Sequence, residues 1–216
     1  MTQLLVFDWD GTLIDSAARI IDCMQRAAAD CALPQPGAEA VRNIIGLGLP
    51  EALAMLYPGI SAADSAQMRK GYSSHFLAAG QEPCPLFPGV AEGLERLAAR
   101  GFLLTVATGK SRRGLDRAFQ ESGIGRLFVD SRCADETQSK PHPQMLLELL
   151  VATGVSADGA VMVGDTEYDL AMAVEAGVAS VGVSYGAHSV ERLQRHGPLD
   201  VIDHFCELEA LLPQGR

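Results

Sequence analysis

The sequence has little positive charge, no clustered cysteines and no long apolar run. Its 216 residues carry 17 Lys and Arg against 27 Asp and Glu, which gives a formal net charge of −10. Because nucleic acids and anionic membrane surfaces attract basic proteins, this charge argues against either as the main partner. No stretch approaches the roughly 18 to 20 apolar residues of a membrane helix. We therefore expect neither a nucleic acid nor a membrane as partner.

The five cysteines are scattered along the chain and form no C-x-x-C pair. They are Cys23, Cys31, Cys84, Cys133 and Cys206. This spacing predicts reduced thiols and excludes the usual zinc and disulfide frameworks. The first apolar run ends at Asp8, so it is too short for the core of a signal peptide. We therefore expect a cytoplasmic protein.

Short apolar runs alternate with helical patterns along most of the chain, which predicts a parallel sheet with helices on both faces. The predicted strands are 4–7, 102–108, 127–130, 160–165, 179–183 and 200–202. The predicted helices are 89–101, one capped by Ser111 that runs toward Gly123, and one with Pro141 in its first turn that runs to Gly154. The expected fold class is α/β with a doubly wound parallel sheet.

Residues 16–83 interrupt this alternation with helical patterns and no convincing strand. They return to the sheet through the segment 81–89, where three prolines indicate a stiff linker. We therefore predict two domains: an α/β core made of residues 1–15 and 84–216, and an inserted helical domain over residues 16–83.

Chemically active side chains follow the ends of several predicted strands. They are Asp8 and Asp10 after the first strand, Thr108, Gly109 and Lys110 after the second, and Asp165 with Asp169 after the fourth; Lys140 stands before Pro141. Ligands of a doubly wound sheet bind outside the carboxyl ends of its strands. We therefore expect these side chains to share one site.

Four carboxylates at one edge need a cation, because two like charges about 4 Å apart cost roughly 4 kcal/mol at an effective dielectric constant of 20. Carboxylate and carbonyl oxygens without nearby His or Cys favour Mg²⁺ over zinc or copper. A magnesium ion beside a lysine and a threonine is suited to holding a transferring phosphoryl group. The residues alone therefore predict phosphoryl chemistry.

Four motifs, in this order, give the sequence a resemblance to the haloacid dehalogenase superfamily, in its phosphatase branch. They are "DWDGTLIDS", "VATGK", "SKPHP" and "GDTEYDLAMA". The resemblance implies that Asp8 is the nucleophile that accepts the phosphoryl group and that Asp10 is the general acid and base. It also implies that Mg²⁺ is held by Asp8, the backbone carbonyl of Asp10 and Asp165, with Asp169 acting close by or through water.

The same resemblance implies roles for the other motif residues. Thr108 and the Gly109 amide would bind the phosphoryl oxygens, and Lys140 would neutralise Asp8 and the phosphate. Gly11 suits a sharp turn that lets backbone amides approach the phosphate. Lys110 is a candidate substrate ligand, although a solvated surface lysine is an equally ordinary interpretation.

The inserted helices resemble the cap of phosphoglycolate phosphatases and β-phosphoglucomutases, which closes over the site and excludes water. The segment 41–53 resembles its substrate-reading loop, with Arg42 as a possible anion contact. The expected substrate is a small phosphorylated metabolite, and the expected assembly is a monomer or a weak homodimer.

Two other functions remain open from the sequence. A phosphosugar mutase would share the fold and the aspartyl phosphate, and it would differ in whether the cap admits water. A phospho-receiver signalling domain would combine similar residues without turnover, but the D-x-D spacing and the insertion count against it.

Overall fold

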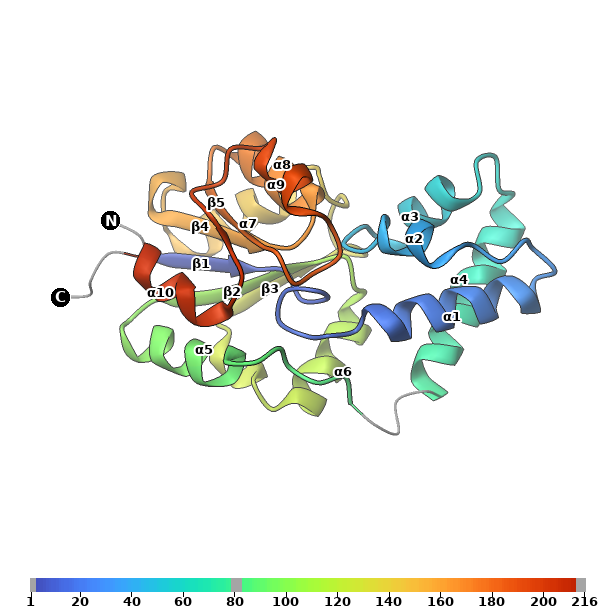
Figure 1. The fold of residues 1–216 in the computed structure, drawn as a ribbon, viewed down its shortest axis with the longest axis horizontal. Coiled ribbons are helices and arrows are strands. Elements are labelled where there is room, and N and C mark those ends of the chain that lie inside the picture. Colours follow the sequence, from blue (N-terminus) through green and yellow to red (C-terminus); the bar gives the residue numbers. More distant parts are fainter. Residues whose placement is uncertain (1–2, 79–82, 213–216) are drawn as a thin grey trace.

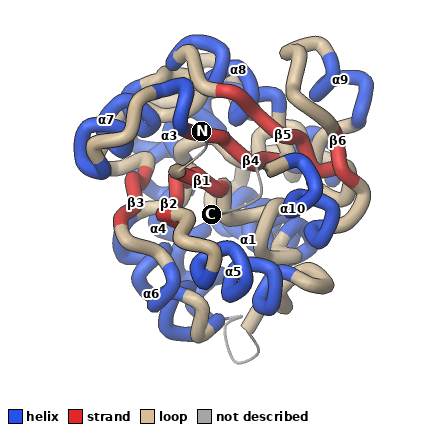
Figure 2. Tube along the Cα trace, turned by 90° about the vertical axis from the view of Figure 1, so that its left-hand side faces the viewer, coloured by secondary structure: helices blue, strands red, loops and turns tan. Residues whose placement is uncertain are grey.

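The computed structural model describes residues 3–78 and 83–212. Six parallel strands form one sheet in the order β3-β2-β1-β4-β5-β6, and Figure 2 shows them side by side. They are β1 Leu4–Phe7, β2 Leu103–Thr108, β3 Asp130–Cys133, β4 Ala160–Gly164, β5 Ala179–Val183 and β6 Val201–Ile202. The chain builds outward from β1 to β3 and then returns to the other side of β1 with β4. This reversal leaves a crevice at the carboxyl end of β1.

Helices cover both faces of the sheet, which confirms the predicted fold class (Figure 1). They are α5 Val90–Ala99, α6 Arg112–Ser122, α7 Gln144–Thr153, α8 Glu167–Ala176, α9 Val190–Gln194 and α10 Leu208–Leu211, with short 3-10 helices at Gly125–Leu127, Ala157–Gly159 and Phe205–Glu207. Side chains of β1 alternate between two buried clusters, because successive strand residues point to opposite faces. Leu5 and Phe7 pack toward α5, whereas Leu4 and Val6 pack toward α7 and α8.

The third strand begins three residues later than the sequence pattern predicted. The apolar run at 127–130 is split, because Leu127 closes a 3-10 turn and Phe128 turns into the aromatic cluster. The Phe128 ring stacks on Phe119 at 5.6 Å and meets the Trp9 ring edge-on at 6.1 Å. Strand pairing with β2 therefore takes the next residues along the chain, Asp130–Cys133.

The helix predicted to begin at Pro141 begins at Gln144 instead. Pro143 stands at its N-cap position, and the residue before a proline is disfavoured in the helical conformation. His142 is therefore excluded from the helix, and Pro141 with it. Lys140 consequently lies in an irregular loop between β3 and α7 and not at a helix start.

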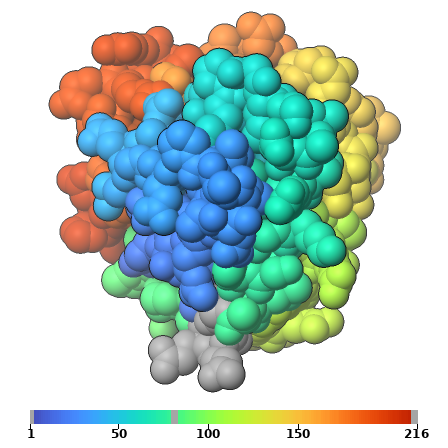
Figure 3. All heavy atoms as spheres, turned by 90° about the vertical axis from the view of Figure 1, so that its right-hand side faces the viewer, coloured from blue at the N-terminus to red at the C-terminus, as the bar shows by residue number. Residues whose placement is uncertain are grey.

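Residues 16–78 hold four helices and no strand. They are α1 Ala17–Asp30, α2 Ala38–Arg42, α3 Leu49–Leu56 and α4 Ala62–Ala78. Side chains of α1 and α4 share one buried cluster, which also takes in Tyr168 from α8. In Figure 3 the atoms of this segment, in blue to teal, cover the centre of one face of the molecule. The division into two domains at 15/16 and 83/84 stays a prediction, and residues 79–82, just before the second boundary, lie outside the described residues.

The two connections between the insertion and the sheet run beside each other. The Asp15 amide donates to the Pro85 carbonyl at 2.9 Å, and the Phe87 amide donates to the Leu13 carbonyl at 3.0 Å. The chain therefore enters and leaves the insertion at one place. Within the part of the chain that the structure describes, no helix has the length and apolar character needed to span a membrane.

Candidate functional site

The predicted site residues meet at the carboxyl edge of the sheet. Asp8 and Asp10 follow β1, Thr108 ends β2 and Asp165 follows β4. All four residues are at most 8% exposed to solvent. Because β1 lies between β2 and β4, the topology alone brings these strand ends together.

Three carboxylates and one ammonium group form the buried centre of the site. Asp8, Asp165 and Asp169 each present an oxygen within 4.8 Å of the others. Lys140 Nζ lies 2.6 Å from Asp8 Oδ1 and 2.6 Å from Asp169 Oδ1. One positive charge thus faces three buried acidic groups, so the cluster is short of positive charge.

The pKa values of these groups reflect the shortage of positive charge. Burial raises the pKa of Asp8 well above its ordinary value, and the neighbouring acids add to the rise against the opposing effect of Lys140. Burial and Asp169 raise the pKa of Asp165 to about 7. Burial opposes the charge of Lys140, but Asp169 and Asp8 outweigh it and raise the pKa of that ammonium group. Lys140 is therefore charged, and each carboxylate opposes the ionisation of its neighbours.

The residues present fit a divalent cation. Asp8 Oδ2 is buried and has no hydrogen-bond partner, and Asp169 Oδ1 has only its ion pair with Lys140. Buried carboxylate oxygens of this kind are costly unless a partner joins them. An all-oxygen donor set suits Mg²⁺.

Gly11 lets the turn after β1 approach Asp165. Its φ angle is +87°, a left-handed conformation that favours glycine, and a Cβ atom there would lie 2.1 Å from Asp165 Oδ2. The Thr12 hydroxyl donates to Asp165 Oδ1 at 2.9 Å, and the Ala187 amide donates to Oδ2 at 2.7 Å. The carboxylate is thus fixed in orientation from two directions.

The Asp10 side chain points away from the acidic cluster. Its Oδ1 accepts a hydrogen bond from Ser16 at 2.6 Å, and its Oδ2 lies 3.0 Å from Lys110 Nζ. The Lys110 ammonium group also lies 4.7 Å from the centre of the Phe76 ring in α4. Asp10 therefore lies between the core, the connection at Ser16 that leads into the insertion, and the insertion itself. There it can exchange a proton with a bound group.

A cavity of about 1080 Å³ lies between the insertion and the core. Thr108 and Gly109 line its inner end beside Asp8, and apolar side chains of α1 line its other wall. Its lining includes six cationic residues, namely Arg19, Arg69, Lys110, Arg112, Arg113 and Arg117. The same lining holds five acidic residues, namely Asp8, Asp10, Asp116, Glu121 and Asp135, so its cations exceed its acids by one in a chain of net charge −10. A cavity with this local excess of cations can accept an anionic ligand.

Arg42 is not among the described residues that line this cavity. It is exposed at the end of α2. Other members of the predicted reading loop do line the cavity, including Ile45, Leu47 and Leu49. The structure thus brings the loop to the site but not its arginine.

The structure adds residues that the sequence analysis did not select. Thr12, Ser16 and Thr166 contact the acidic residues directly, and Tyr72 lines the cavity. Burial and Asp10 raise the pKa of Tyr72, so its hydroxyl keeps its proton and can donate to a ligand. The capping-box spacing T-x-x-D was a signal for Thr166. No local sequence pattern pointed to Tyr72, because its position depends on how the insertion folds back.

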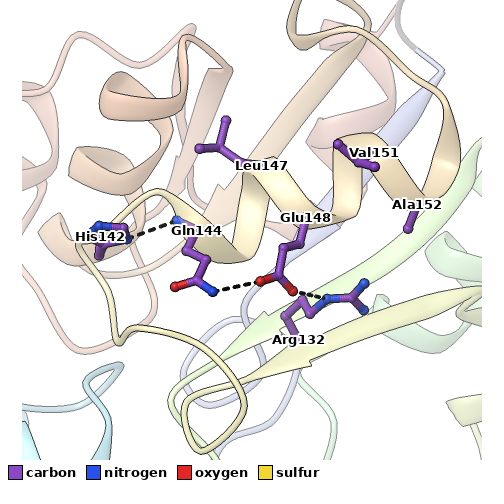
Figure 4. Close-up of a pocket in the computed structure, with 7 residues that line it drawn as sticks. All are labelled: Arg132, His142, Gln144, Leu147, Glu148, Val151 and Ala152. Carbon is purple, nitrogen blue, oxygen red and sulfur yellow. Dashed lines mark hydrogen bonds and ion pairs between the residues drawn. The ribbon is translucent and has the colours of Figure 1, made fainter.

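A second cavity, of about 450 Å³, lies on α7 beside the edge strand β3 (Figure 4). Arg132 and Glu148 form an ion pair across it at 2.8 Å, and Leu147 and Val151 supply an exposed apolar side. None of the acidic cluster lines this cavity. It is therefore separate from the strand-end site.

Comparisons with known proteins agree with this geometry. A family model described as "Haloacid dehalogenase-like hydrolase" matches residues 5–183. The chain is 35% identical to "Probable phosphatase IndB" of Dickeya dadantii over 213 residues, which cover 96% of this chain and 92% of that one. It is 37% identical to "Phosphoglycolate phosphatase" of Rhodospirillum rubrum over 219 residues, 96% of this chain and 90% of that one.

A solved structure shares the fold over nearly the whole chain. It is described as a "predicted phosphoglycolate phosphatase" from Haemophilus somnus, and it superposes with a TM-score of 0.84 at 26% identity, covering 97% of each chain. The match of the family model spans most of the sheet and the acidic residues at its edge. The chain belongs to the haloacid dehalogenase-like hydrolases.

Proposed function

We propose that the chain is a magnesium-dependent phosphatase that hydrolyses a small phosphorylated metabolite through an aspartyl phosphate. The observation that carries the proposal is the difference in surroundings between two acids that stand two residues apart. Asp8 is buried against Lys140, with one oxygen unpartnered, whereas Asp10 is held apart by Ser16 and Lys110. One acid is thus placed to attack and the other to move a proton.

In the first half-reaction, an Asp8 carboxylate oxygen attacks phosphorus and the bond from phosphorus to the ester oxygen breaks. Asp10, in its acid form, gives its proton to the leaving oxygen, so the product alcohol departs neutral. In the second half-reaction, Asp10 as carboxylate takes a proton from water as the water attacks the phosphoryl group. The bond between phosphorus and the Asp8 oxygen breaks, which frees the Asp8 carboxylate and inorganic phosphate. Asp10 is protonated again.

Mg²⁺ would be held by Asp8, Asp165, Asp169 and the backbone carbonyl of Asp10. When bound, it supplies the positive charge that the acidic cluster lacks and that a phosphate needs on arrival. Lys140 shares that task at Asp8 and Asp169. Thr108 and the Gly109 amide hold the remaining phosphoryl oxygens.

The proposed substrate is a small phosphoester, and 2-phosphoglycolate is a first candidate because relatives carry that name. The slight excess of cationic over acidic residues in the cavity lining and the Lys110 ammonium group beside Asp10 support an anionic substrate. Membership in a hydrolase family favours turnover over a signalling role. We keep the expectations of a cytoplasmic monomer or weak homodimer, without nucleic acid or membrane partners, as predictions.

The decisive experiment measures phosphate release from a panel of phosphoesters with Mg²⁺ and with chelator. The panel contains 2-phosphoglycolate, sugar phosphates and nucleotides. Asp8→Asn should abolish release, and acid-quenched wild-type protein should carry a phosphoryl group on Asp8. Asp15→Asn is the matched control, since Asp15 is an exposed acid in the same segment.

Two outcomes would contradict the proposal. Turnover by Asp8→Asn at the wild-type rate would remove Asp8 as nucleophile. Isomerisation of β-glucose 1-phosphate, only with a bisphosphate primer and with phosphate release at background, would identify a mutase instead.

A further inference from the structure

Three consecutive residues of the insertion, Gly46 to Gly48, lie against three separate loops of the core site. A Cβ atom at Gly46 would lie 3.0 Å from Thr166 Oγ1, in the loop after β4. A Cβ atom at Gly109, in the loop after β2, would lie 2.4 Å from the Leu47 carbonyl oxygen. The third contact is a hydrogen bond at 2.7 Å, in which the Gly48 amide donates to Ser139 Oγ.

Ser139 connects this insertion loop to the lysine of the acidic cluster. Its hydroxyl accepts from the Gly48 amide and donates to the carbonyl of Lys140 at 3.3 Å. A single side chain thus links the insertion to the peptide that carries Lys140. Only a group that both accepts and donates can make this connection.

The loop that carries Lys140 needs such support. Residues 134–143 form neither helix nor strand, so no ladder of backbone hydrogen bonds fixes them. Lys140 Nζ must nevertheless stay 2.6 Å from the Asp8 carboxylate, in the loop after β1, and 2.6 Å from the Asp169 carboxylate, in the first turn of α8. A displacement of about 1 Å at such a group is enough to cost orders of magnitude in rate.

We propose that Ser139 is a positioning residue that fastens Lys140 to the insertion loop at Gly48. Docking of that loop on the core and correct placement of Lys140 then become one event, because the same hydroxyl serves both. This inference rests on the proposed phosphatase function for its rate measurement, whereas its structural part does not.

The test compares Ser139→Ala, which removes the acceptor of this hydrogen bond, with Gly48→Ala, which changes the residue that donates it. Gly48 has a φ angle of −60°, which alanine adopts without strain. The added methyl would lie 3.2 Å from Ser139 Oγ, 3.1 Å from Ala134 Cβ and 2.5 Å from the mobile end of Glu51. Each variant should lower kcat by about 10- to 100-fold and change KM by less than about threefold.

The double variant should be no slower than the slower single variant, because both changes break one connection. Thr137→Ala is the matched control, since among the described residues its hydroxyl donates to the carbonyls of Cys133, at the end of β3, and of Gln138, and to no group of the insertion. It should keep the wild-type kcat. Thermal unfolding of all variants shows that they are folded.

Hydrogen exchange supplies a measurement that does not depend on turnover. Amides of 44–49 and 137–142 should exchange faster in Ser139→Ala than in the wild type or in Thr137→Ala. Unchanged exchange, a wild-type kcat for Ser139→Ala, or losses that multiply in the double variant would each overturn the inference. If the wild type releases no phosphate from any ester, the proposed function fails and hydrogen exchange alone decides the role of Ser139.

Discussion

A single buried lysine offsets part of the negative charge at the proposed site. Lys140 is 1% exposed and contacts Asp8, which follows β1, and Asp169, in the first turn of α8. Its removal leaves Asp8 and Asp169 buried without their common partner. The stability of the core and the proposed chemistry therefore depend on the same side chain.

We predict that Lys140→Met lowers the free energy of unfolding by about 3 to 5 kcal/mol in chelator, the usual cost of breaking a buried ion pair from one side. Urea unfolding measures it. Lys70→Met, at an exposed position of α4, is the control and should change stability by less than about 0.5 kcal/mol. Equal losses in the two variants would show that Lys140 has no special part in the core.

A second residue prediction concerns Asp10. If it protonates the leaving oxygen and later activates water, Asp10→Asn should lower kcat by about 10²- to 10⁴-fold on alkyl phosphates. With p-nitrophenyl phosphate, whose leaving group needs no proton, the variant should show a rapid burst of p-nitrophenolate followed by slow turnover. Absence of a burst with wild-type steady-state rates would exclude Asp10 from proton transfer.

At the scale of helices and strands, the N-terminus of α8 orients one of the acids. Thr166 caps this helix, donates to Asp169 Oδ2 at 2.7 Å and completes a capping box with it. The other oxygen of Asp169 is thereby turned toward Lys140 and the acidic cluster. The helix cap and the proposed metal site are thus parts of one arrangement.

We predict that Thr166→Val destabilises the protein by about 0.5 to 2 kcal/mol and also raises the Mg²⁺ concentration needed for half-maximal activity. Ser111→Ala, at the N-cap of α6, should cost similar stability and leave the Mg²⁺ requirement unchanged. Thermal unfolding and magnesium titrations measure the two effects. An unchanged Mg²⁺ requirement in Thr166→Val would separate the cap from the metal site.

Local patterns in the sequence predicted the elements whose signals are local. The run at 4–7, the cap at Ser111 and the acids after β1 and β4 are all where the pattern indicated. The start of β3 was not predicted, because Phe128 is drawn into a cluster built by distant residues. The bond between Gly48 and Ser139 spans 91 positions along the chain, so no window of sequence contains it.

At the scale of the whole molecule, the excess of buried acid makes stability depend on pH. Burial and Asp169 raise the pKa of Asp165 to about 7 in the folded protein, above its ordinary value of 3.8. The folded state therefore binds this proton more tightly than the unfolded state. The stability contributed by this group falls as pH rises through that window.

We predict that Mg²⁺ raises the melting temperature more at about pH 8 than at about pH 5, because its ligands must lose their protons to bind it. Melting curves with Mg²⁺ and with chelator at both pH values measure the effect. Asp165→Asn should reduce the difference between them. A larger shift at the lower pH would contradict this assignment of the cluster.

The two adjacent connections between the insertion and the sheet bear on how such proteins diversify. The hydrogen bonds of Asp15 with Pro85 and of Leu13 with Phe87 bring entry and exit of the insertion to one point of the surface. A graft of another helical module at that junction would leave the register of the sheet unchanged. Selectivity and reactivity can then evolve as exchangeable parts, provided that each new module again supplies a loop able to reach Ser139.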